Sequence, residues 1–203
     1  LMPNPGDSGN ALGAALAQRN DYVVWKTPYL GTNIPGEYPV EKALDLLLKG
    51  EIFGIASGQA EYGPRALGNR SLLADPRGPE IKDKVNEIKR RQKFRPFAPV
   101  ILEEYVHDYF DIPAKTSPYM QFTGVCKHPD KFPAITHIDG TSRVQTVSKT
   151  QNKGLYSLIK AFMDQTGCPM ILNTSLNIRG EPMVNTREDA DRFERAYGIT
   201  VVS

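Results

Sequence analysis

The sequence contains few of the residues that mark disulfide-rich or metal-binding proteins. Its 203 residues include two cysteines, Cys126 and Cys168, too few for a disulfide framework or a cysteine metal cluster. Both are expected to be small buried residues, and their scarcity fits a reducing cytoplasm. The three histidines, His107, His128 and His137, show no metal-ligand spacing. We therefore expect a cytoplasmic chain and assign it no metal-binding residues.

Long apolar runs and an excess of one charge are also missing. No run is long enough to cross a bilayer, and no signal-peptide pattern opens the sequence, so a membrane partner is not expected. With 25 basic and 23 acidic residues the formal charge is +2, which excludes bulk attraction to nucleic acid. The length is enough for one sizeable domain, or one domain plus a fragment.

Hydrophobic periodicity and turn residues predict a mixed fold. The pattern favours helices at 11–17 (ending near Asn20), 40–48, 79–91, 104–110, 155–166 and 186–197. It favours strands at 52–56, 71–74, 97–102, 119–125, 143–147, 170–172 and 201–202. Breakers such as Gly31 and Pro35 make the stretch before residue 37 resemble a linker. Because strands and helices do not strictly alternate, we predict a mixed α/β (α+β) sheet domain.

Basic residues gather in two segments. The loop EYGPRALGNRS (61–71) carries Arg65 and Arg70 among glycines and a proline, and arginine suits a bidentate grip on phosphate or carboxylate. A salt-bridged surface loop is the alternative interpretation. A second cluster, which includes Lys89, Arg91 and Arg95, precedes an apolar run. Cations at a helix end complement the helix dipole, which explains residues 89–93 but not Arg95.

A third segment, MILNTSLNIRG (170–180), indicates a buried strand that runs into a polar turn. Asn173, Ser175 and Asn177 follow the apolar part of that strand. Ligands of open α/β sheets tend to bind beyond the carboxyl ends of strands. Asn and Ser also favour turns because their side chains bond to the local backbone. For each residue taken alone, ligand binding and turn formation are therefore both open.

Four blocks together resemble the C-terminal part of the nodulation-type O-carbamoyltransferases. They are EYGPRALGNRS (61–71), FRPFAP (94–99), HIDGTSRVQTV (137–147) and NTSLN (173–177), in the family's order. GDSGNALGAAL (6–16) resembles the end of that family's N-terminal domain. One departure is Gln92, where many relatives would carry an acidic residue.

The resemblance implies a fold, a reaction and a domain division. Residues 37–203 would be a YrdC-like domain, a twisted mixed sheet flanked by helices, that makes carbamoyl-adenylate from carbamoyl phosphate and ATP with Mg²⁺. Residues 1–36 would be a linker and the end of an actin-like ATPase-fold domain, the partner that passes the carbamoyl group to an acceptor hydroxyl. As catalytic residues we expect Lys89, Arg95 and Arg143. As ligand-binding residues we expect Arg65, Arg70, Arg91, Asn173 and Ser175.

Two other functions stay open at this point. A threonylcarbamoyl-adenylate synthase would share the YrdC-like fold but would need a pocket for threonine and bicarbonate. An RNA-binding module could use residues 82–95 as an electrostatic footprint, although the balanced charge and the lack of an evident aromatic stacking motif count against it.

Overall fold

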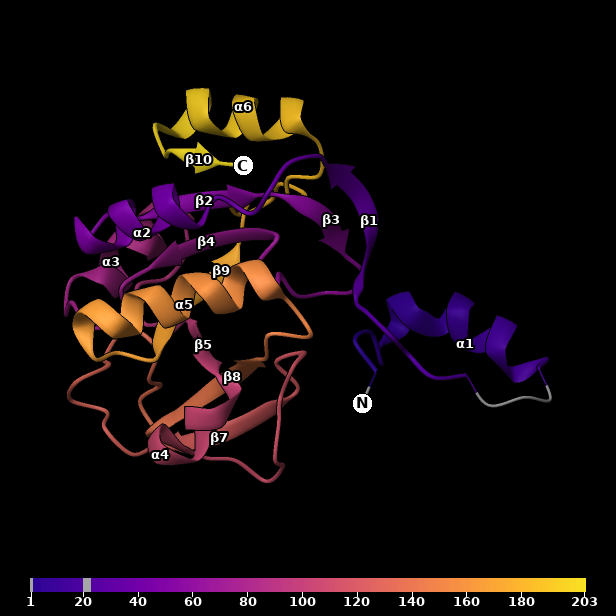
Figure 1. Ribbon diagram of the computed structural model, residues 1–203, viewed down its shortest axis with the longest axis horizontal. Coiled ribbons are helices and arrows are strands. Elements are labelled where there is room, and N and C mark those ends of the chain that lie inside the picture. Colours follow the sequence, from indigo (N-terminus) through magenta and orange to yellow (C-terminus); the bar gives the residue numbers. More distant parts are fainter. Residues whose placement is uncertain (1, 20–22) are drawn as a thin grey trace.

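A computed structural model describes residues 2–19 and 23–203 (Figure 1). The strands are β1 (Tyr29–Ile34), β2 (Phe53–Ala56), β3 (Gly58–Glu61), β4 (Arg70–Ala74), β5 (Ala98–Leu102), β6 (Phe110–Asp111), β7 (Phe122–Cys126), β8 (Thr141–Val147), β9 (Met170–Ser175) and β10 (Val201–Val202). The helices are α1 (Asn10–Ala17), α2 (Val40–Leu48), α3 (Ile81–Ile88), α4 (Val106–Tyr109), α5 (Lys153–Thr166) and α6 (Arg187–Tyr197), with 3-10 turns at Asp7–Gly9 and Glu103–Tyr105.

Eight strands form one mixed sheet in the order β10-β2-β4-β9-β5-β8-β7-β6. The pairs β10/β2 and β5/β8 are parallel, and the other neighbours are antiparallel. β1 and β3 make a separate two-stranded sheet. The order places β9 at the centre, between β4 and β5, so the polar end of β9 lies beside the strands that adjoin both basic segments.

Helices cover both faces of the large sheet. α2 and α5 lie side by side on one face, and Leu47 and Phe162 from these helices enter the main core (Figure 1). α6 packs on the other face, where Phe193 joins a second apolar cluster. The sheet separates two apolar clusters because side chains alternate along each strand. Leu73 of β4 faces the first cluster and Leu72 faces the second.

The mixed α+β architecture agrees with the sequence prediction. The helix prediction at 186–197 is confirmed by α6, whose cap is a full capping box between Thr186 and Asp189. The expected end of the first helix near Asn20 lies outside the described residues. β3 and the short β6 were not predicted from the sequence.

The stretch before residue 37 is more ordered than its breakers suggest. Residues 29–34 form β1, which pairs with β3 and shifts register between Tyr29 and Asn33. Long-range hydrogen bonds explain this, since the Tyr29 hydroxyl donates to the Leu67 carbonyl at 3.1 Å. A tertiary contact of this kind overrides local propensity.

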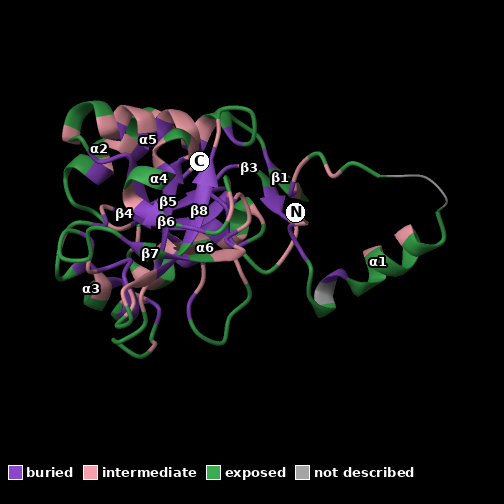
Figure 2. Cartoon of the chain, turned by 90° about the horizontal axis from the view of Figure 1, so that it is seen from below, coloured by how far each residue is buried: buried purple, intermediate pink, exposed green. Residues whose placement is uncertain are grey.

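The N-terminal helix extends away from the body. No residue of α1 is buried, and Figure 2 shows it mostly exposed. The segment before it does touch the body, because a Cβ at Gly63 would lie 2.9 Å from the Pro3 carbonyl oxygen. None of the helices described here has the length and apolar character needed to span a bilayer.

Candidate functional site

Lys89 is a buried ammonium at the end of α3. It is only 5% exposed, and its Nζ donates to the Ser175 carbonyl (2.6 Å), the Ser175 hydroxyl (3.0 Å) and Oδ1 of Asn177 (2.9 Å). Burial, and secondarily the neighbouring Arg91 charge, lower the pKa of Lys89 to about 7. Its proton is therefore poised to respond to an anion near neutral pH.

The chain reverses sharply after Lys89. Arg90 takes a left-handed conformation (φ 50), in the place where a helix usually ends in glycine. The Arg91 amide donates a hydrogen bond to the Asn86 carbonyl at 3.0 Å, so α3 ends in a Schellman-type motif. This turn lets Lys89 and Arg91 contribute to one site although they flank an exposed residue.

Arg91 is fixed by a hydrogen bond and by stacking. Its Nε donates to Oδ1 of Asn86 at 2.7 Å, and its guanidinium lies 4.3 Å from the centre of the Phe97 ring. Asn86 also donates to the carbonyls of Lys93 and Arg95, so it holds the whole turn. Partial burial, then the charges of Arg95 and Arg143, lower the pKa of Arg91 to about 10.

Two adjoining hollows share Arg91 and Arg95. The first, of about 290 Å³, is lined by Lys89, Gln92, Ser175, Asn177, Ile178, Arg179 and Gly180 besides the shared pair. The second, of about 330 Å³, is lined by Pro96, Phe97, Ala98, Thr123, His137, Thr141, Ser142 and Arg143 besides the same pair. Among the described residues, no ion pair joins these lysines and arginines to a carboxylate. The arrangement suits a polyanion.

Arg65 adds a further charge beside Arg143. Partial burial and the nearby Arg65 charge lower the pKa of Arg143, which projects from β8. Arg65 itself is exposed in the loop between β3 and β4. Like charges gathered in this way repel each other in the free protein, and a bound anion would relieve that repulsion.

Glu61 holds the loop that carries Arg65. Its Oε1 accepts from the amides of Leu67 (2.8 Å), Asn69 (2.7 Å) and Arg70 (3.3 Å). Gly68 has φ +115 and lies against α5, where a Cβ would come within 2.5 Å of the Leu155 side chain. The glycines of this motif therefore allow positive φ angles and a close approach of the loop to α5.

Arg70 was expected to bind a ligand, but the structure places its side chain in the protein interior. It is fully buried, and its guanidinium donates to five backbone carbonyls: Asn185, Ser57, Asn69, Thr32 and Gly58. An arginine has five N–H donors, so none remains for a ligand. Arg70 links β1, the β2–β3 turn and the segment before α6, and we leave it out of the site.

The polar end of β9 divides between two roles. Ser175 reaches Lys89, as described above. Asn173 is buried, and its amide donates to the Ala66 carbonyl (3.1 Å) and to Oε1 of Gln145 (2.7 Å), while its own Oδ1 has no partner. The amide of Asn173 therefore supports the loop that carries Arg65, and we leave Asn173, which was expected to bind a ligand, out of the binding set.

The predicted set omitted residues that line the hollows, among them Asn177, Arg179 and His137. For Asn177 the signal was present, because alternate residues at a strand end share a side with Ser175. Arg179 lies beside Lys89 in the first hollow because the Arg179 amide donates to the Lys89 carbonyl at 3.1 Å. This contact joins positions distant in sequence, so local pattern could not reveal it.

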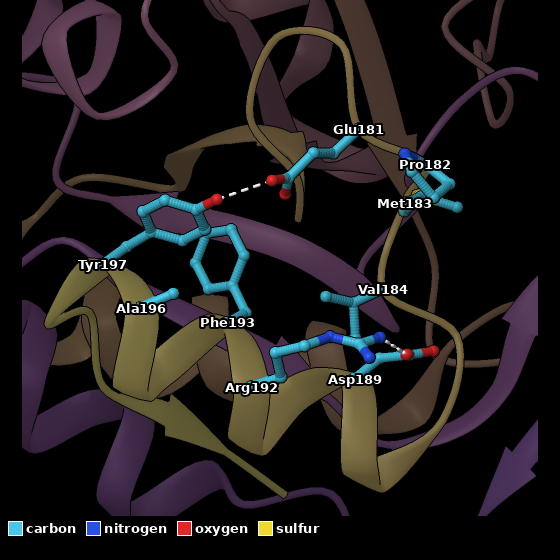
Figure 3. Close-up of a pocket in the computed structure, with 9 residues that line it drawn as sticks. All are labelled: Glu181, Pro182, Met183, Val184, Asp189, Arg192, Phe193, Ala196 and Tyr197. Carbon is cyan, nitrogen blue, oxygen red and sulfur yellow. Dashed lines mark hydrogen bonds and ion pairs between the residues drawn. The ribbon is translucent and has the colours of Figure 1, made fainter.

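A cavity larger than either of these hollows lies elsewhere among the described residues. It has a volume of about 470 Å³ between α6 and the segment 181–184 (Figure 3). Its floor includes Phe193, and its charged groups are already paired: Arg192 with Asp189, and Glu181 with the Tyr197 hydroxyl at 2.6 Å. Size alone therefore does not mark the anion site.

Comparison with known proteins identifies the family. A sequence model described as "Carbamoyltransferase C-terminus" matches residues 44–202. This chain belongs to the carbamoyltransferase C-terminal family. Nodulation protein NolNO of Sinorhizobium fredii is 37% identical, covering 94% of this chain and 32% of that protein. Nodulation protein NolO of Bradyrhizobium diazoefficiens is 38% identical, covering 94% and 40%. The chain thus spans about a third of the length of these relatives.

Solved structures show the same fold. HypF from T. kodakarensis superposes with a TM-score of 0.54 at 22% identity, over 83% of this chain and 20% of that one. A full-length HypF in a phosphate- and nucleotide-bound form gives a TM-score of 0.57 at 16% identity, over 82% and 21%. The family assignment favours a carbamoyltransferase over the synthase and RNA-binding alternatives.

Proposed function

We propose that this chain forms carbamoyl-adenylate from carbamoyl phosphate and ATP, as the adenylate-forming part of an O-carbamoyltransferase. The observation that carries the proposal is the convergence of Lys89, Arg91, Arg95 and Arg143 on two adjoining hollows without acidic partners. The HypF structure described as phosphate- and nucleotide-bound supports a nucleotide as ligand of this fold.

The proposed chemistry uses carbamate as nucleophile. Hydrolysis of carbamoyl phosphate gives carbamate and phosphate. A carbamate oxygen then bonds to the α-phosphorus of ATP, the bond to the β-phosphate oxygen breaks, and pyrophosphate leaves. Negative charge grows on the α-phosphate and the leaving group, where fixed cations stabilise it. We assign Lys89, Arg95 and Arg143 to that role, and Arg65, Arg91 and Ser175 to binding.

The described residues that line the two hollows include no acidic side chain. No group of three acidic, histidine or cysteine side chains able to hold an ion occurs in the part of the chain described here. Mg²⁺ would therefore arrive with ATP, bound by phosphate oxygens and water. We assign no step to a protein-held ion.

We place acceptor transfer outside this chain. The relatives are about three times as long, and we propose that residues 1–36 are a linker and the end of an N-terminal actin-like domain that delivers the carbamoyl group to a hydroxyl. The exposed α1 fits a segment that packs against another unit.

The direct test is pyrophosphate release from ATP with and without carbamoyl phosphate. We expect release to depend on carbamoyl phosphate and not to be supported by threonine with bicarbonate. ATP binding, measured by titration calorimetry, should weaken by about tenfold or more between about 0.05 M and 0.5 M salt, since several cations face the phosphates. Binding that ignores salt would argue against a phosphate-dominated site.

ATP binding should also take up protons. The pKa of Lys89 is about 7 in the free protein, and nearby phosphate charge should raise it. At about pH 8 the free lysine is mostly neutral, so binding should draw close to one proton from the buffer. Calorimetry in buffers of different ionisation enthalpy measures this number. Lys89→Met should abolish the uptake, whereas Lys84→Met, an exposed lysine on α3, should leave it unchanged.

A further inference from the structure

His137 lines the same hollow as Arg91, Arg95 and Arg143, yet it takes no part in the function proposed above. It opens a tight turn into β8. The Gly140 amide donates to the His137 carbonyl at 2.9 Å, and the His137 amide donates to the Thr141 carbonyl at 2.8 Å. The position of the ring is therefore set by a closed backbone turn rather than by a free loop.

Asp139 fixes the orientation of the His137 ring. Its Oδ1 lies 3.1 Å from Nδ1 of His137. The same oxygen accepts from the Thr141 hydroxyl (2.6 Å) and amide (2.9 Å), and these bonds lower the pKa of Asp139 to about 2. The Asp139 carboxylate accepts a hydrogen bond from the Nδ1–H group, and in the ring tautomer that makes this bond Nε2 carries the lone pair.

The other side-chain nitrogens of this hollow only donate. The guanidinium groups of its arginines have no acceptor capacity. The Ser142 hydroxyl is buried and donates to the Ile135 carbonyl at 2.7 Å, and the Thr141 hydroxyl donates to Asp139. The oxygens of these two groups and of Thr123 are the other side-chain acceptors in the lining of this hollow. Among the described residues lining the hollow, His137 alone offers a nitrogen lone pair.

We propose that Nε2 of His137, held by Asp139, accepts a hydrogen bond from the carbamoyl amino group and so selects a carbamoyl ligand over its methyl analogue. The inference rests on the proposed function and deepens it. The arginines bind the anionic part of the ligand, which carbamoyl and acetyl compounds share. The amino group is what distinguishes them, and it needs an acceptor that the arginines cannot supply.

Carbamoyl phosphate and acetyl phosphate are the matched probes, since they differ by an amino group in place of a methyl group. Binding of each to the full chain is measured by titration calorimetry. The wild type should prefer carbamoyl phosphate by about fivefold, the value of one net hydrogen bond. His137→Leu should remove the preference while leaving acetyl phosphate affinity unchanged. His137→Gln, whose amide oxygen can accept, should restore part of it. His107→Leu, at an exposed position of α4 that does not line the hollow, is the control.

The outcomes separate the inference from the proposed function. Equal binding of both probes by the wild type overturns the inference but leaves the anion site standing. A parallel loss of both probes in His137→Leu also overturns it, because the ring would then act as a cation toward phosphate. No recovery in His137→Gln would show that shape, rather than a hydrogen bond, made the preference. Failure of the wild type to bind either probe would overturn the proposed function as well.

Discussion

Arg95→Ala should reduce carbamoyl phosphate-dependent pyrophosphate release by about 100-fold or more while leaving the fold intact. Arg95 is exposed and lines both hollows, so its guanidinium can reach the reacting phosphates from either side. Removing one preorganised donor from a site where charge develops typically costs about that factor. Steady-state release of pyrophosphate measures the effect, with circular dichroism as the check on folding.

Lys93→Ala is the matched control for this variant. Lys93 lies two residues away, is exposed, and pairs with Glu87 at 2.7 Å rather than facing the hollows. Its loss should leave pyrophosphate release within about twofold, since exposed pairs contribute little. Near-normal release by Arg95→Ala would refute the catalytic assignment. Equal losses in both variants would show that general positive charge, rather than the position of Arg95, matters.

Arg70→Met should destabilise the protein by about 3 kcal/mol or more, because buried carbonyls would lose their donors. Arg70 is fully buried and donates to five backbone carbonyls from four separate segments. Methionine keeps much of the volume but supplies no N–H group. The midpoint of denaturant unfolding gives the change in stability.

Arg65→Met tests whether the effect is specific. Arg65 belongs to the same loop but is exposed, so its replacement should change the free energy of unfolding by no more than about 0.5 kcal/mol. It should weaken ATP binding instead. A stable Arg70→Met that had lost ATP binding would return Arg70 to the ligand set. A stable variant with normal binding would contradict the structural role.

Helices and strands that are specified by local sequence pattern were predicted correctly. The periodicity at 155–166 and the cap at Thr186 specify helices because side-chain spacing and capping act within a few residues. The apolar run that became β5 was recognised for the same reason. β1 was missed because its residues are mostly exposed and include Gly31, and this segment becomes a strand through pairing with β3 and a hydrogen bond from Arg70.

The mixed α+β class, the basic segments and the family resemblance can all be read from the amino-acid sequence, and the family match confirmed the resemblance. Residue types and their spacing carry that information directly. Which of these cations is exposed and which is buried depends instead on the folded arrangement. Arg65 and Arg70 belong to one motif, yet Arg65 is exposed near Arg143, whereas Arg70 is buried and donates all its hydrogen bonds to backbone carbonyls. Burial and hydrogen-bond partners depend on segments far apart in the chain, and the central place of β9 between β4 and β5 brings those segments together.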